Sequence, residues 1–111
     1  MLTFPFSEAV IGGWIRQIVS ALGYIHHSQI IHRDINPNNL LPKNDVVKIA
    51  DFGMATYCPK PDGRKLTIFE SNLYSAPEFA MRKDYSFEVD LWSLGVSLYV
   101  MLNKKFPLSK E

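Results

Sequence analysis

Apolar residues recur between residues 8 and 27 at three- and four-residue steps, with polar residues between them. The recurring positions are Ile11, Trp14, Ile15, Ile18, Leu22 and Ile25. This spacing places one apolar stripe on one face of an α-helix. Ser7 is a suitable N-cap, and we expect the helix to end near residues 27–28. We interpret the stripe as core packing and assign it no ligand.

A second long helix is expected at residues 88–102, where apolar residues occur on nearly every side. A helix that is apolar all round is typical of a buried position. Asn103 is expected to end it, because Pro107 prevents its continuation. The apolar run is too short to cross a bilayer, which needs roughly 20 residues.

Shorter elements are expected between the two helices. Ile30-Ile31 predicts a short strand, and residues 40–41 and 46–49 predict a hairpin with its turn at residues 42–45. The polar segment after Gly53 is expected to be a long loop, since it contains Pro59, Pro61 and Gly63. Pro77 can occupy the first position of a short helix.

Composition narrows the class of protein. The chain has 111 residues, 47% of them hydrophobic and 21% charged, which fits one folded domain at most. The formal net charge of +1 gives no reason to expect a nucleic-acid or membrane partner. Cys58 is the sole cysteine, which excludes an internal disulfide and suits a reducing, cytoplasmic compartment. The first residues lack the basic start and apolar core of a signal peptide.

Four short motifs follow one another along the chain. They are His32-Arg33-Asp34 with Asn39 shortly after it, Asp51-Phe52-Gly53, Ala76-Pro77-Glu78, and Asp90-Leu91-Trp92-Ser93-Leu94-Gly95. Any single motif would mean little, but in this order they resemble the catalytic half of a eukaryotic protein kinase. The resemblance implies an α+β, mainly α fold, the C-terminal lobe of a kinase domain. Residues 1–111 would be a partial domain, from the helix before the catalytic loop through the central buried helix, without the N-terminal lobe and the last helices.

The resemblance implies a role for each polar motif residue in phosphoryl transfer. Asp34 would be the base that orients the acceptor hydroxyl, and Asn39 and Asp51 would hold Mg²⁺ against the phosphates of ATP. Leu41 would form the apolar floor beneath the adenine ring. Taken one at a time, these residues are ordinary turn residues, because Asp and Asn are common in turns.

Other motif residues are expected to be structural or regulatory. His32 and Phe52 would pack in the spine that links the two lobes. Asp90 would accept backbone hydrogen bonds from the His-Arg-Asp turn, since a buried carboxylate needs donors. Arg33 would receive an activation-loop phosphate. Glu78 would pair with an arginine beyond the C-terminal end of this sequence.

The chain departs from the kinase pattern in ways that bear on activity. Asn36 stands where serine/threonine kinases usually have a lysine that contacts the transferring phosphate, so a positive charge is missing from the transition-state site. We therefore expect Asn36→Lys to raise the rate. Ser71 keeps a hydroxyl that can bond the base, but Glu70 before it adds bulk and negative charge. No Gly-rich phosphate loop or strand lysine precedes the motifs within these residues.

The segment between Asp51 and Ala76 resembles the polo-like kinase 4 (Sak) branch of the family. The similar residues are Ala55-Thr56, Lys60-Pro61-Asp62, Arg64 and Leu66-Thr67-Ile68. The resemblance implies phosphorylation of serine or threonine in protein substrates, self-phosphorylation at Thr67, and a role in centriole duplication at the centrosome. It also implies self-association of the parent protein. The alternative is a catalytically inactive, pseudokinase-like fragment that acts as a binding module; a tyrosine kinase fits Asn36-Pro37-Asn38 less well.

Overall fold

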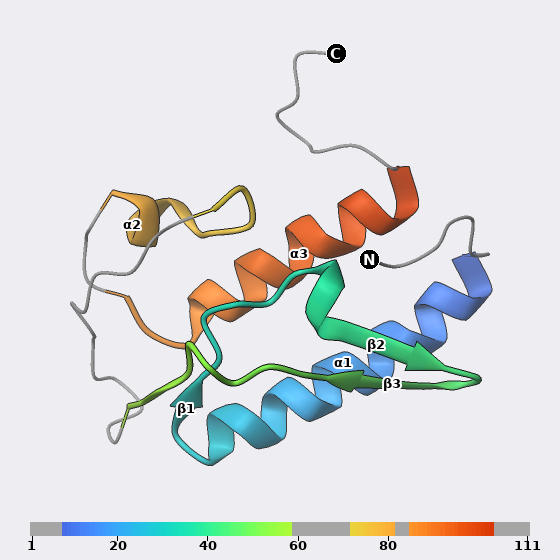
Figure 1. The fold of residues 1–111 in the computed structure, drawn as a ribbon, viewed down its shortest axis with the longest axis horizontal. Helices are drawn as coiled ribbons and strands as arrows, with labels where there is room; N and C mark the ends of the chain where they lie inside the picture. The colour runs from blue at the N-terminus through green and yellow to red at the C-terminus, as the bar shows by residue number, and fades with distance from the viewer. Residues whose placement is uncertain (1–7, 59–71, 82–84, 104–111) are drawn as a thin grey trace.

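The structure is a computed structural model that describes residues 8–58, 72–81 and 85–103 (Figure 1). Two long helices and two small antiparallel sheets make up the described part of the chain. In order, the elements are α1 (Glu8–His27), β1 (Ile30–Ile31), the 3-10 helix η1 (Pro37–Asn39), β2 (Leu40–Lys43), β3 (Val46–Ile49), β4 (Thr56–Tyr57), α2 (Pro77–Ala80) and α3 (Glu88–Asn103). The α+β class expected from the sequence is therefore present.

Both sheets contain two strands. β2 pairs with β3, with Leu40 opposite Ile49 and Lys43 opposite Val46. The hairpin was predicted, but its turn is shorter than expected, because the strand continues through Lys43 and only residues 44–45 turn. Asn44 adopts a φ of 57°, a left-handed conformation that asparagine tolerates well.

No local pattern in the sequence predicts the other sheet. β4 pairs with β1, with Ile31 opposite Thr56, inside the segment that was predicted to be a loop. Two residues are too few to show a periodicity, so only the distant partner strand defines β4. The bounds of β1 itself were predicted correctly.

The first long helix confirms the prediction from its spacing. Ile11, Trp14, Ile18, Leu22 and Ile25 are all buried, and Ile15 packs against them. They share one core with residues of the turn after β1, the hairpin and α3: Ile35, Leu40, Val47, Leu94 and Met101. In Figure 1 the hairpin lies along α1, and α1 packs mainly against β3 and β1. The predicted cap, Ser7, lies outside the described residues.

The second long helix, α3, is not buried on all sides, so that prediction was wrong. Its bounds agree with the sequence, but Leu91 is 55% exposed and Trp92 is 46% exposed. Polar residues lie inside instead: Asp90, Ser93 and Ser97 are buried. An apolar helix without periodicity does not reveal which face is covered, and here the buried polar groups decide the orientation.

Within the described ranges, the structure has no helix that combines the length and the apolar character required to cross a membrane.

Candidate functional site

The turn between β1 and η1 brings Asp34, Asn36 and Asn39 together. The amide nitrogen of Asn36 donates to Oδ1 of Asp34 at 3.1 Å, and that of Asn39 donates to Oδ2 at 3.1 Å. The same two nitrogens also donate to the main-chain oxygen of Asp34, at 3.1 and 2.8 Å. Each carboxylate oxygen therefore has one fixed donor, and lone pairs remain for a further donor such as a hydroxyl.

Asn36 has a second task in the same turn. Its side-chain oxygen accepts a hydrogen bond from the main-chain nitrogen of Asn38 at 2.9 Å, which makes it the N-cap of η1. An N-cap satisfies a backbone donor that has no partner within the helix. The residue thus fixes the start of η1 and one oxygen of Asp34 together.

The turn is anchored from beneath by Asp90, at the start of α3. Its carboxylate, which is 0% exposed, accepts hydrogen bonds from the main-chain nitrogens of His32 at 2.8 Å and Arg33 at 2.9 Å. His26, in the last turn of α1, contacts the same carboxylate at 2.8 Å. A buried carboxylate without hydrogen-bond partners would be costly in free energy. The three contacts supply these partners, and they join α1, α3 and the turn at Asp90.

Arg33 is held in an uncommon backbone conformation. Its φ of 71° lies in the left-handed region, which costs a non-glycine residue of order 1 kcal/mol. Besides its bond to Asp90, Arg33 donates from Nε to the main-chain oxygen of Met54 at 2.7 Å and from Nη1 to the hydroxyl of Tyr85 at 2.8 Å. These bonds offset the strain and fix the guanidinium next to the segment after Gly53. The phosphate acceptor expected to meet it, Thr67, lies outside the described residues, as does Ser71.

His32 connects the turn that carries Asp34 to the second motif, Asp51-Phe52-Gly53. Its Nδ1 accepts from the main-chain nitrogen of Asp34 at 3.1 Å, so Nε2 carries the proton that faces the main-chain oxygen of Ala50 at 2.9 Å. The ring of Phe52 meets the His32 ring edge-on, with 4.8 Å between centroids. His32 is fully buried, whereas Phe52 is 47% exposed. The two residues expected in the spine are therefore in contact, and Phe52 has an open side.

Asn39 and Asp51 lie at the same end of the β2–β3 hairpin. Asn39 precedes β2, Asp51 follows β3, and the main-chain nitrogen of Ala50 donates to the main-chain oxygen of Asn39 at 2.9 Å. Asp51 is exposed in a left-handed conformation, φ 60°, and its Oδ1 accepts from the nitrogen of Gly53 at 3.1 Å. Because the Asn39 amide nitrogen serves Asp34, its oxygen is the atom that would face a cation. One carboxylate and one amide oxygen fit Mg²⁺, which keeps several other oxygen ligands.

Two further predicted residues have less distinctive surroundings. Leu41, the expected floor of the adenine site, is 50% exposed on β2. Glu78 lies half-buried in the first turn of α2, and its expected arginine partner is not in this sequence.

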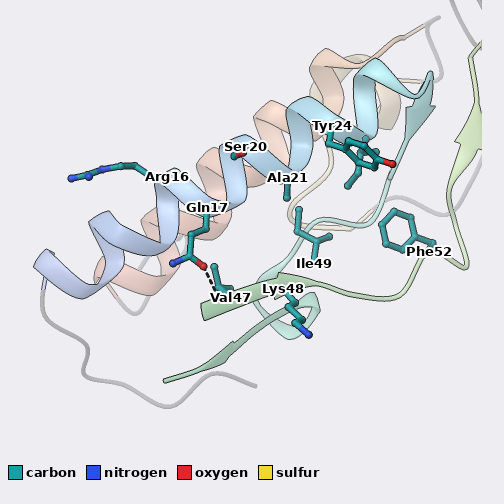
Figure 2. Close-up of a pocket in the computed structure, with 10 residues that line it drawn as sticks. Arg16, Gln17, Ser20, Ala21, Tyr24, Val47, Lys48, Ile49 and Phe52 are labelled. Carbon is teal, nitrogen blue, oxygen red and sulfur yellow. Dashed lines mark hydrogen bonds between the residues drawn. The ribbon is translucent and has the colours of Figure 1, made fainter. Parts of the chain in front are cut away.

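The structure also has a pocket that the sequence did not predict (Figure 2). It has a volume of about 730 Å³ and lies between α1 and β3, beside Phe52. Tyr24, Ala21 and Ile49 give it a mainly apolar wall, and Gln17 closes one side by accepting a hydrogen bond from the nitrogen of Val47 at 2.8 Å. Its lining residues come from two separate segments, so no local motif could have indicated it.

His26 was missed as well. The sequence offered one signal, a histidine in the last turn of a helix that leads into the motif segment. That signal is weak, because such a histidine is also explained by the favourable interaction of a cation with a helix C-terminus. The contact with Asp90 is formed across 64 positions of the chain and depends on the tertiary fold.

Comparison with known proteins defines the class. The family model described as "Protein kinase domain" matches residues 2–111, and the chain belongs to this family. Its relatives include serine/threonine-protein kinase PLK4 of Drosophila ananassae and of Drosophila virilis, each 40% identical over 108 residues. The PLK4 of Drosophila melanogaster is 38% identical over 108 residues. The chain is covered to 96% in these matches but spans 14% of each relative's length. The resemblance to the kinase family and its polo-like kinase 4 branch is thus confirmed.

Proposed function

We propose that this chain is the part of a serine/threonine protein kinase that orients the acceptor hydroxyl and holds the metal. One observation carries the proposal: the carboxylate of Asp34 is held between Asn36 and Asn39 on a turn anchored to buried Asp90. Positioning and charge stabilisation supply most of the catalysis in phosphoryl transfer, so a rigidly oriented carboxylate is the group required.

In the proposed reaction Asp34 binds the hydroxyl of a serine or threonine and turns its oxygen toward the phosphoryl group. Asp34 accepts the proton that the hydroxyl loses as its oxygen forms the new bond to the γ-phosphorus of ATP, while the bond from that phosphorus to the bridging oxygen breaks and ADP leaves. Asn39 and Asp51 would hold Mg²⁺, which, when bound with ATP, neutralises charge on the phosphates. Leu41 would contact the adenine from one side. Arg33 would bind a phosphate on the activation segment, at Thr67 by our proposal.

We further propose that residues 1–111 belong to the C-terminal lobe of the domain, with Asp90 and α3 at its centre. The relatives are named as serine/threonine kinases, which supports protein substrates for this chain. A cytoplasmic and centrosomal location, a role in centriole duplication and self-association of the parent protein are proposed on the same relationship. The relatives on which these proposals rest are much longer than this chain.

The first test uses the 111-residue chain alone. We predict no measurable transfer of radiolabelled phosphate to a generic protein acceptor, because these residues include no Gly-rich phosphate loop or strand lysine to position the nucleotide. Turnover that disappears in Asp51→Ala would contradict this prediction.

Nucleotide titration of the full-length protein distinguishes the kinase from the alternative, a binding module without catalytic activity. ATP binding that requires Mg²⁺ and is lost in Asp51→Ala supports the kinase. Unchanged binding in Asp51→Ala, or no binding at all, supports the binding module.

A further inference from the structure

We propose that Asn36 is a positioning residue for the Asp34 carboxylate, rather than merely a missing lysine; the inference rests on the proposed function. Two of its hydrogen bonds reach Asp34, one to the main-chain oxygen and one to Oδ1, both at 3.1 Å. A third, accepted from the nitrogen of Asn38 at 2.9 Å, fixes the opposite end of the amide.

The geometry locks the side chain of Asn36. The nitrogen of the Asn36 amide lies within hydrogen-bond distance of two oxygens of Asp34, while the amide oxygen faces the backbone of η1. Rotation about the last side-chain torsion would break all three bonds at once. The side chain is also half-buried, which limits competition from water. Asn36 therefore links the start of η1 to one carboxylate oxygen of Asp34, so that the position of η1 also fixes that oxygen.

Asn39 provides the matching contact on the other carboxylate oxygen. Its amide nitrogen donates to Oδ2 at 3.1 Å and to the main-chain oxygen of Asp34 at 2.8 Å. With one amide on each oxygen, the plane of the carboxylate is set from both sides. A carboxylate held in this way is pre-organised for its acceptor hydroxyl, and it needs no rearrangement during the reaction.

A lysine could not perform this combination. Its ammonium has three donors and no acceptor, so it could approach Asp34 but could not cap the nitrogen of Asn38. Asn36→Lys therefore exchanges the cap of η1 for a positive charge. The rate increase expected from the charge alone would be reduced by the loss of that cap.

The test separates the donors of Asn36 from its cap. In the full-length protein, Asn36→Asp and Asn36→Ser both keep an oxygen that can cap η1, but they remove the amide donors. We predict that kcat falls about a hundredfold in Asn36→Asp, which also places like charges together, and about tenfold in Asn36→Ser. The KM for ATP should change less than about twofold, since Asn36 acts through Asp34. Asn38→Ala is the matched control and should retain wild-type kcat, because Asn38 contributes only its main-chain nitrogen.

Three kinetic outcomes would overturn the inference. Wild-type kcat in both Asn36→Asp and Asn36→Ser would show that Asn36 caps η1 but does not position Asp34. A loss in Asn36→Asp alone would be charge repulsion and not lost donation. An equal loss in Asn38→Ala would assign the effect to the turn as a whole.

A second readout does not depend on activity. In the 111-residue chain labelled with ¹⁵N-asparagine, the side-chain amide protons of Asn36 should exchange more slowly than those of exposed Asn38. The difference should become smaller in Asp34→Ala, which removes the Oδ1 acceptor and keeps the main-chain oxygen. Equal exchange in the wild-type chain overturns the inference. If exchange at Asn36 is slow but the full-length protein transfers no phosphate, the contact between Asn36 and Asp34 is supported and the proposed function is rejected.

Discussion

α1 and α3 differ in the side chains that they bury: the buried residues of α1 are all apolar, whereas those of α3 include polar ones. α1 buries the apolar stripe that its spacing predicts. α3 buries Asp90, Ser93 and Ser97 and exposes Leu91 and Trp92. The two helices therefore have different roles: α1 contributes apolar side chains to the core, whereas the inner face of α3 also makes hydrogen bonds to other segments. In a helix of the second kind, the buried polar residues locate the functional face.

The bonds made by α3 support this interpretation. Asp90 holds the main-chain nitrogens of His32 and Arg33, and Ser93 donates to the main-chain oxygen of Tyr74 at 2.7 Å. Ser97 donates back to the oxygen of Ser93 at 2.8 Å within the helix. The inner face of α3 therefore orders both the turn that carries Asp34 and the segment that leads into α2.

Removing the carboxylate of Asp90 should have the largest effect on stability. Asp90→Ala leaves the main-chain N–H groups of His32 and Arg33, and the side chain of His26, without their acceptor, and we expect a loss of about 4 kcal/mol in the free energy of unfolding. Urea unfolding of the chain measures the loss. Asp45→Ala, in the exposed hairpin turn, is the matched control and should change stability by less than about 0.5 kcal/mol. Equal free energies of unfolding for Asp90→Ala and Asp45→Ala would show that Asp90 does not anchor the turn.

Truncation of the α1 stripe should cost somewhat less. Leu22 is 1% exposed, and Leu22→Ala should lower the free energy of unfolding by about 3 kcal/mol through lost burial and a cavity. The control is Val19→Ala, at an exposed position on the same helix. Ala21→Gly is less suitable, because it would change helix propensity as well as packing. Urea unfolding that gives both variants the same midpoint would contradict the assignment of the stripe to the core.

The outer face of α3 should matter for association rather than for folding. Leu91→Lys and Trp92→Glu replace exposed apolar side chains and should change the free energy of unfolding by less than about 0.5 kcal/mol. Because the apolar patch is exposed in this chain, we expect the wild-type chain to associate and the double variant to be more nearly monomeric in sedimentation experiments. A monodisperse wild-type monomer with a sharp cooperative melt would count against this expectation.

The smallest effect is expected at Tyr74, whose main-chain oxygen binds Ser93. Burial raises the pKa of Tyr74 above its ordinary value of 10.0, so the folded chain holds the phenolic proton more tightly than the unfolded chain. The contribution to stability is complete below the unfolded pKa and is lost as the pH rises through the folded pKa. Stability should therefore fall above about pH 10, and Tyr74→Phe should remove part of that fall. An identical alkaline profile in Tyr74→Phe would show that other groups cause it.

Local patterns in the sequence predicted a large part of the fold. The α1 stripe, the strand at Ile30, the hairpin and the ends of α3 were all predicted, because each leaves a signal within a few residues. β4 and the exposed face of α3 were not predicted, since they depend on which distant segments pack together.

The candidate site divides in the same way. The motifs indicated Asp34, Asn39, Asp51 and Asp90, whose roles stay predictions. The contact of His26 with Asp90 and the pocket beside Phe52 could not be predicted, because each joins residues far apart in the chain. The double task of Asn36 depends on the torsions of one turn, which a sequence motif does not specify.

The most direct measurement of the central claim is transfer of radiolabelled phosphate from ATP to a protein serine or threonine by the full-length protein. We predict that Asp34→Asn and Asp51→Asn each lower the rate by at least about a hundredfold, while Asp45→Asn, an exposed aspartate in the hairpin turn, leaves it unchanged. Wild-type activity in Asp34→Asn, with normal folding, would contradict the account.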